Sequence, residues 1–168
     1  MTADGLVRAH ADLAYRVALR VTGCQADAAD AAQDALVNVW HHIETVEPDR
    51  RRAWVARVAR NAALDLVRRR RVRPQPGLAE PVSEPASAAP LPDDDAHTAD
   101  LRAGIARALG TLDEPYRSLL VLRDVEGLAY AEVADALDLP LNTMKVYLLR
   151  ARRRFQTALS AASPDLVP

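Results

Sequence analysis

The chain has 168 residues, which is enough for one ordinary domain or two small ones. Hydrophobic residues make up 49% of it and aromatic residues only 4%, and much of the apolar content is alanine, which favours helices over sheets. The formal net charge of −1 by itself indicates no nucleic-acid partner, and a single cysteine excludes an intrachain disulfide. We therefore expect an all-α protein in a reducing compartment.

Several classes of function have no support in the sequence. The N-terminal residues lack a charged lead followed by a hydrophobic run, and no window approaches the length of a membrane span, so we expect a cytoplasmic protein without membrane insertion. No phosphate-binding loop, nucleophile elbow or zinc-ligand spacing is present, and the adjacent His41 and His42 cannot face one site on a helix. The sequence thus indicates no enzyme, no cofactor and no metal site.

Three helices are predicted in the first part of the chain. The first spans residues 4–22 and ends at Gly23, the second spans about 27–43 with Asp27 as its N-cap, and the third spans about 51–71. The residues expected to face the core are Leu6, Leu13, Val17 and Val21 in the first helix, Leu36, Val39, Trp40 and Ile43 in the second, and Trp54, Val58, Ala62 and Leu66 in the third.

A segment of different composition follows these helices. More than half of the chain's eleven prolines lie in residues 73–97, and residues 74–100 carry six acidic side chains and no lysine or arginine. Because such a segment cannot pack a core, we expect a flexible acidic linker. The linker would separate two small helical domains, 1–72 and 98–160, and a tail, 161–168, would follow the second domain.

The second domain is predicted to end in a helix-turn-helix over residues 127–155. One helix starts near Thr98, and Pro115 opens another that ends at Gly127. Pro140 then separates the last two helices, because proline cannot continue a helix. The apolar stripe of the last helix consists of Met144, Leu148, Ala151 and Phe155, and its basic residues are mostly off that stripe. This pattern is typical of a helix that enters a DNA major groove, although ordinary helical bundles also contain such pairs.

Arginine is concentrated around the third helix, where residues 49–73 carry ten arginines and two acids. A polar face opposite the apolar stripe consists of Arg57, Asn61, Asp65 and Arg68. Asparagine pairs with adenine edges and arginine with guanine or phosphate, so this face indicates a nucleic-acid contact. The alternative is a solvated face.

The second helix has a mixed acidic face. It consists of Asp27, Asp30, Gln33, Asp34 and Asn38. Acids in a first turn favour the helix dipole without any further role. The other interpretation is a docking face for a basic protein partner.

Three segments resemble regions two and four of bacterial RNA polymerase sigma factors, and in particular the compact extracytoplasmic-function (ECF) group. They are DAADAAQDALVNVW (27–40), RAWVARVARNAALDLVRRRR (52–71) and LDEPYRSLLVLRDVEGLAYAEVADALDLPLNTMKVYLLRARRRF (112–155). The resemblance covers nearly everything except the linker and the last ten residues. It implies a factor that binds core RNA polymerase, directs it to specific promoters and helps to open the minus-ten region. It also implies an anti-sigma partner and a chain that is monomeric when free.

The resemblance also assigns roles by position. The segment that docks on polymerase matches Asp27, Asp30, Gln33 and Asp34. Contact with the minus-ten element is expected from Arg57, Arg60, Asn61, Asp65 and Arg68, with Trp54 as a supporting core residue. Contact with the minus-thirty-five element is expected from Asn142, Thr143, Lys145, Val146, Leu149 and Arg150.

Five positions depart from the family pattern, and one of them is Ala129, which replaces the expected serine N-cap before Tyr130. Ala56 stands where tyrosine is usual, and Val146 and Tyr147 replace a small hydroxyl residue and an arginine. Leu149 is apolar where a polar or aromatic residue is common. Apolar side chains that face a groove can contact thymine methyl groups, and the alternative is that they pack on a protein partner. The sequence leaves open whether these changes reset promoter choice or weaken it.

The alternative function is that of a stand-alone helix-turn-helix regulator. Such a protein would normally dimerise and read a palindrome without help from polymerase. The chain has no evident dimerisation helix or effector domain.

Overall fold

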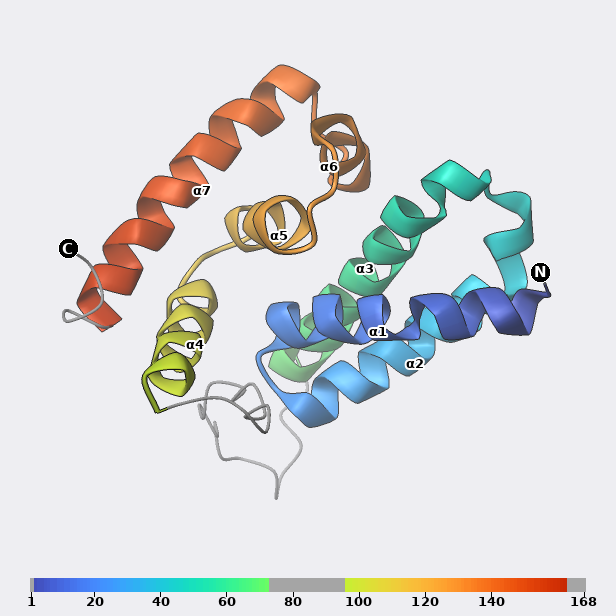
Figure 1. The fold of residues 1–168 in the computed structure, drawn as a ribbon, viewed down its shortest axis with the longest axis horizontal. Helices are drawn as coiled ribbons and strands as arrows, with labels where there is room; N and C mark the ends of the chain where they lie inside the picture. Colours follow the sequence, from blue (N-terminus) through green and yellow to red (C-terminus); the bar gives the residue numbers. More distant parts are fainter. Residues whose placement is uncertain (1, 73–95, 163–168) are drawn as a thin grey trace.

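The structure is a computed structural model that describes residues 2–72 and 96–162. Every regular element in those two stretches is helical, which confirms the predicted all-α fold. Figure 1 shows two groups of helices, one before and one after the segment that is not described. The predicted linker, apart from its last two residues, and the predicted tail after Ala162 lie outside the described residues.

The first unit consists of three long helices. They are α1 (Ala3–Thr22), α2 (Gln25–His42) and α3 (Arg51–Val72), and two short 3-10 turns, Ile43–Thr45 and Pro48–Arg50, lie between α2 and α3. The Thr2 hydroxyl caps α1 by accepting a hydrogen bond from the Gly5 N–H at 3.3 Å. Gly23 ends α1 with φ at 70°, in the left-handed region that glycine adopts without strain.

Two predictions about α2 are wrong. Cys24 occupies the N-cap position without a capping side chain, so Asp27 lies inside the first turn. Trp40 is 49% exposed, because the buried line of α2 runs through alanines to Val39 and the next side chain points about 100° further round the helix. The small alanines allow close helix packing, and the indole stays outside, where its N–H donates to the Asp4 carboxylate at 2.9 Å.

The inner face of α3 also differs from the predicted one. The fully buried residues are Val55, Ala56, Ala59 and Ala63. The predicted residues Trp54, Val58, Ala62 and Leu66 are only half-buried at the edges of the core. α3 packs on both α1 and α2, and small side chains suit the line of closest approach. Ala56, at the position of the usual tyrosine, is therefore a core residue with no exposed surface.

The second unit contains the predicted helix-turn-helix. Its helices are α4 (Ala96–Gly110), the short α5 (Tyr116–Leu120), α6 (Tyr130–Ala136) and α7 (Leu141–Ala162), and a π-helical turn, Val121–Val125, extends α5. α4 begins two residues before Thr98. Ala129 offers no capping side chain to α6, but the Glu132 carboxylate accepts a hydrogen bond from the Ala129 N–H at 2.7 Å. The turn between α6 and α7 contains Asp138 with φ at 52°.

The two units pack against each other. One cluster of buried side chains combines Leu6 and Leu13 of α1 with Leu119, Leu122 and Leu128 of the second unit. α1 contacts α4, and α3 contacts α6. α3 therefore lies beside the helix-turn-helix (Figure 1). The sequence predicted two domains but did not predict this contact.

Candidate nucleic-acid interface

One side of α7 is an exposed surface that faces away from the core. The inward side carries the predicted stripe of Met144, Leu148, Ala151 and Phe155. The outward side carries Asn142, Lys145, Val146, Leu149 and Arg150. Of the six residues predicted to read the minus-thirty-five element, only Thr143 is half-buried. α7 runs along the outer edge of the second unit, so the structure brings this predicted set together on one accessible helix (Figure 1).

Tyr147 belongs to the packing of the second unit. Its ring centroid lies 5.8 Å from that of Tyr116, and the Arg154 guanidinium lies 4.3 Å from the Tyr116 ring centroid. Aromatic and cation–π contacts of this kind hold α7 against α5. Packing therefore explains the departure at Tyr147, whereas Val146 and Leu149 remain exposed.

Arg152 fixes the orientation of α7. Its guanidinium donates two hydrogen bonds to the Asp124 carboxylate, from Nε to Oδ2 at 2.9 Å and from Nη2 to Oδ1 at 2.7 Å. The hydrogen bonds to Asp124 raise the pKa of Arg152. Because a bidentate pair specifies geometry as well as attraction, Arg152 positions the helix.

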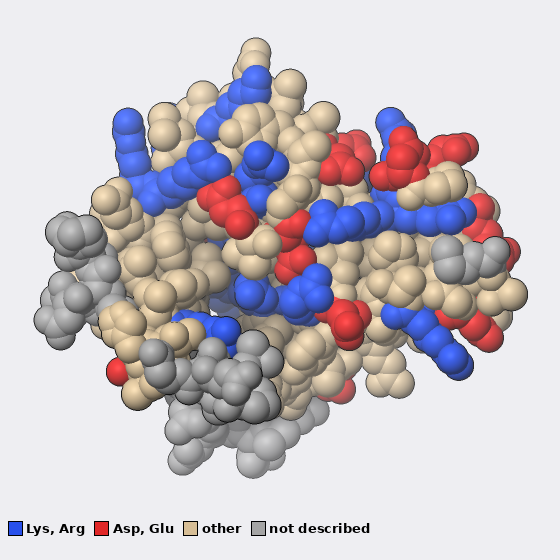
Figure 2. All heavy atoms as spheres, viewed as in Figure 1, with Lys and Arg blue, Asp and Glu red and all other residues tan. Residues whose placement is uncertain are grey.

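Four of the five residues predicted to contact the minus-ten element lie around one polar depression on α3. Arg60, Asn61, Asp65 and Arg68, together with Leu64, line a hollow of about 310 Å³. Arg60 donates from Nη1 to Oδ1 of Asn61 at 3.2 Å, and Arg68 forms an ion pair with Asp65 at 3.6 Å. Figure 2 shows that basic side chains gather over the second unit, at the upper left of the view, whereas basic and acidic side chains are interspersed over the first unit.

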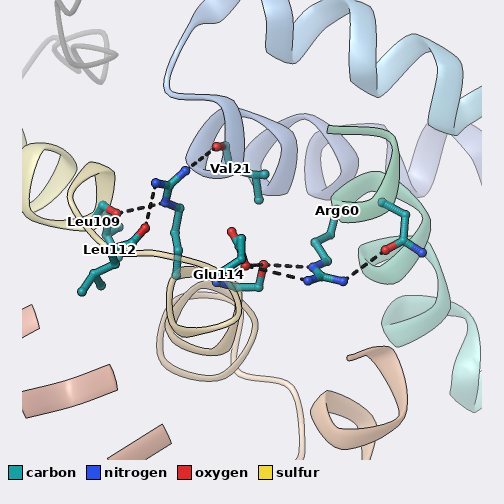
Figure 3. Close-up of polar contacts among 8 residues, drawn as sticks. Val21, Arg60, Leu109, Leu112 and Glu114 are labelled. Carbon is teal, nitrogen blue, oxygen red and sulfur yellow. Dashed lines mark hydrogen bonds and ion pairs between the residues drawn. The ribbon is translucent and has the colours of Figure 1, made fainter. Parts of the chain in front are cut away.

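Arg57 and Arg60 contact the second unit. Arg57 donates from Nη2 to Oδ1 of Asp138 at 3.1 Å. Arg60 donates from Nε to the Ser118 hydroxyl at 2.9 Å and lies 3.8 Å from the Glu114 carboxylate (Figure 3). Burial lowers the pKa of Arg60, and the charge of Glu114 opposes that shift. Two side chains expected to contact DNA therefore have protein partners in this arrangement.

Other residues, which the sequence did not indicate, also join the two units. Arg117 of α5 donates to the Val21 carbonyl at the end of α1 at 2.9 Å, and to three carbonyls within residues 109–112 (Figure 3). Glu126 is 7% exposed and accepts a hydrogen bond from Nη2 of Arg16 at 3.0 Å, which raises the pKa of Arg16. No sequence signal marks these residues, because helical periodicity carries no information about contacts between distant segments.

The acidic face of α2 is partly occupied by α3. Asp27 is 8% exposed and forms an ion pair with Arg70, and Asp34 lies 3.7 Å from Arg69. The other two residues predicted to bind polymerase, Asp30 and Gln33, are exposed. Asp27 thus supports the packing of α2 on α3, and the remaining three are accessible.

An apolar groove between α1 and α2 lies beside Gln33. It has a volume of about 530 Å³, and its lining includes Tyr15, Val37 and Trp40. These three side chains are 36%, 57% and 49% exposed. Contiguous exposed apolar side chains commonly mark an interaction site. The sequence did not indicate this groove, because its helical pattern predicted Trp40 to lie in the core.

The described residues contain no candidate metal-binding site. Within residues 2–72 and 96–162, no three His, Cys, Asp or Glu side chains lie close enough together to hold a metal ion. None of the helices in these stretches is both long and apolar enough to cross a membrane.

Comparisons with known proteins match both units. Residues 6–73 match the Sigma-70 region 2 family and residues 102–155 match the Sigma-70, region 4 family. The ECF RNA polymerase sigma factor SigL of Mycobacterium tuberculosis is 33% identical over 152 residues, which cover 89% of this chain and 84% of that protein. The ECF RNA polymerase sigma factor SigE of Mycolicibacterium smegmatis is 34% identical over 163 residues. That match covers 96% of this chain and 63% of SigE, so the chain spans less than two thirds of the length of that relative.

Two solved structures are similar to both units together. CnrH, in complex with the cytosolic domain of CnrY, is 28% identical with a TM-score of 0.65, and the match covers 95% of this chain and 88% of CnrH. The sigma factor RpoE from Bartonella quintana, in complex with the anti-sigma factor NepR, shares the fold with a TM-score of 0.70 at 23% identity, covering 89% of this chain and 91% of RpoE. Both regions are thus present, and the chain belongs to the ECF family of RNA polymerase sigma factors.

Proposed function

We propose that this chain binds core RNA polymerase through α2 and directs it to promoters, with α7 reading the minus-thirty-five element and α3 contacting the minus-ten element. The observation that carries the proposal is the two-sided character of α7. Its apolar side is buried in the second unit, and its other side presents Asn142, Lys145 and Arg150 to solvent. The second helix of a helix-turn-helix places such a side in the major groove.

The exposed side of α7 has the chemistry of a base-reading surface. Asparagine forms two hydrogen bonds with an adenine edge, and lysine or arginine pairs with guanine. The same basic side chains can bind phosphate oxygens, which fix the position of the helix without specifying sequence. Asn142 and Lys145 are therefore proposed to specify bases or position the helix, and Arg150, at the side of the exposed surface, is proposed to contact the backbone.

The surface of α2 is suited to a protein partner. Asp30 and Asp34 supply negative charge, and the groove that includes Trp40 supplies apolar area next to them. A basic amphipathic helix would satisfy both features, because it can bury apolar side chains in the groove and pair its charges at the rim. We place core polymerase on this surface.

Contact of Arg57 and Arg60 with the minus-ten element requires a rearrangement. Arg57 and Arg60 are held by Asp138, Ser118 and Glu114 of the second unit. They become available to DNA only when the two units separate or these side chains turn away. CnrH and RpoE were solved with CnrY and NepR bound. We propose that this chain, too, has an inhibitory protein partner, and that it acts in the cytoplasm, where the polymerase is.

In vitro transcription tests the function directly. Purified core polymerase and the full chain are expected to initiate at specific promoters that core polymerase alone does not use. A chain with Asn142→Ala and Lys145→Ala should bind core polymerase normally and lose promoter-specific transcripts, whereas Arg107→Ala, an exposed change on α4, should behave as wild type. Failure of the wild-type chain to bind core polymerase would refute the proposal. A dimer that binds a palindrome tightly without polymerase would favour the stand-alone regulator.

A further inference from the structure

Val146 and Leu149 occupy the centre of the exposed side of α7. Asn142, Val146, Leu149 and Arg153 recur at the same spacing as the buried stripe of Met144, Leu148, Ala151 and Phe155, displaced by two residues. Since each residue turns a helix by about 100°, a displacement of two residues places the first set about 200° from the second, on the opposite side. The two apolar side chains are 48% and 51% exposed.

Polar residues flank this apolar pair. Lys145 lies on one side of the line and Arg150 on the other, and Asn142 and Arg153 continue it at either end. In the described residues, neither Val146 nor Leu149 belongs to a hydrophobic core cluster or packs against one. The apolar pair therefore lies at the middle of the surface that would meet base edges.

The major groove offers one kind of apolar group at base edges. Thymine carries a C5-methyl group there, whereas the other bases present hydrogen-bond donors and acceptors. Valine and leucine cannot satisfy those polar groups, and a polar edge buried against them would lose its hydrogen bonds to water. An apolar pair in the groove thus favours thymine over the other bases.

We propose that Val146 and Leu149 select thymine at two neighbouring positions of the minus-thirty-five element by contact with its C5-methyl groups. This inference rests on the proposed role of α7 and names the bases that it reads. The two side chains are three residues apart, or about 4.5 Å along the helix axis. Base pairs are about 3.4 Å apart along a strand, so the two side chains can reach neighbouring positions.

The test compares thymine with deoxyuridine, which lacks only the C5-methyl group. Holoenzyme, assembled from core polymerase and the full chain, first selects its minus-thirty-five element from a randomised promoter library. The selected element is expected to contain thymine, on either strand, at two neighbouring positions. Replacing either thymine by deoxyuridine should weaken holoenzyme binding about fourfold, as expected for the loss of one buried methyl-sized group.

Single substitutions assign each position to a side chain. In Val146→Ala the affinity ratio of thymine to deoxyuridine duplexes should fall to about one at one position, and in Leu149→Ala at the other. Both residues are exposed, and circular dichroism verifies that both variants fold. Lys145→Ala is the matched control, because it lies on the same exposed surface and should weaken binding to both duplexes equally.

Each contrary outcome has a separate meaning. The methyl contact is overturned if the selected element contains no thymine. It is also overturned if the affinity ratio of thymine to deoxyuridine duplexes is one at every position while Lys145→Ala still weakens binding. Either result leaves α7 as the DNA reader. Unchanged DNA binding by all three variants would overturn the proposed function of α7 as well. If Val146→Ala impairs binding to core polymerase but leaves thymine preference unchanged, the pair is a protein contact and the inference fails.

Discussion

Arg57 of α3 and Asp138 of the turn before α7 form an ion pair across the two units, with 3.1 Å between Nη2 and Oδ1. Arg57 belongs to the proposed minus-ten surface, and Asp138 belongs to the helix-turn-helix. The pair therefore joins the two proposed DNA-binding parts of one chain. The side chain of Asp138 is 80% exposed and that of Arg57 is 34% exposed. An ion pair this accessible to water contributes at most about 1 kcal/mol.

Asp138→Asn tests this estimate. Asparagine tolerates the left-handed backbone at φ 52° and removes only the charge. We expect the free energy of unfolding, measured in urea, to fall by less than about 1 kcal/mol. Asp138→Leu is the contrasting variant, since it loses the charge and also strains the backbone, and it should destabilise the chain more. A loss of several kcal/mol in Asp138→Asn would make the pair a principal contact between the units.

Glu114→Gln should have a larger effect than Asp138→Asn. The side chains of Arg60 and Glu114 are 14% and 27% exposed, and both contact Ser118, which is fully buried. Removing the carboxylate charge leaves the Arg60 guanidinium largely buried without its counter-charge, so we expect a loss of about 1–3 kcal/mol in the free energy of unfolding. Faster amide hydrogen exchange in α5 and the facing part of α3 would locate the loss at the contact between the units. Equal stability of the two variants would contradict the ranking.

The sequence predicted the helix-turn-helix well because its signals are local. Gly127 marks its start, Pro140 marks the turn between its two helices, and the stripe from Met144 to Phe155 has a clear helical period. Which residues of a helix are buried depends also on the helices that pack against it. Trp40 shares the hydrophobic character of Val39, yet only the packing of α1 and α3 on α2 determines which of them is buried.

The contact between the two units could not be predicted for the same reason. Arg57 and Asp138 are 81 residues apart in the chain, and each is an ordinary polar residue in its own segment. The residues of the proposed minus-ten surface could be named from a family resemblance. Their engagement by Ser118 and Glu114 depends on how two helical units meet, and periodicity contains no information about that.

His10 should make stability depend on pH. Burial, followed by the charges of Arg51 and Arg52, lowers the pKa of His10 below its ordinary value of 6.5. Between the lowered pKa and 6.5, the unfolded chain binds more protons than the folded chain, so the free energy of unfolding rises with pH across that window. The contribution of His10 to stability is therefore present above the window and is lost as the pH falls through it. Urea unfolding of wild type and His10→Gln at several pH values measures this contribution.

The comparison with His10→Gln isolates one residue from the other titrating groups. Wild type should lose more stability than His10→Gln when the pH is lowered from about 7.5 to about 5.5, because only wild type gains a proton at this site on unfolding. Parallel losses in the two proteins would mean that the surroundings of His10 do not disfavour its charged form.

Lys145 offers a measurement of how α7 meets DNA. Lys145 is exposed beside Val146 and Leu149, so it reaches either phosphate or a base edge when the helix enters the groove. If it binds phosphate, Lys145→Ala should flatten the slope of log affinity against log salt for holoenzyme on minus-thirty-five duplexes by roughly 0.9 and leave sequence preference unchanged. If it pairs with guanine, discrimination at one position should fall by about 1–3 kcal/mol. Arg107→Ala, on the exposed side of α4, should change neither quantity. An unchanged slope together with unchanged affinity in Lys145→Ala would exclude the placement of this side of α7 in the groove.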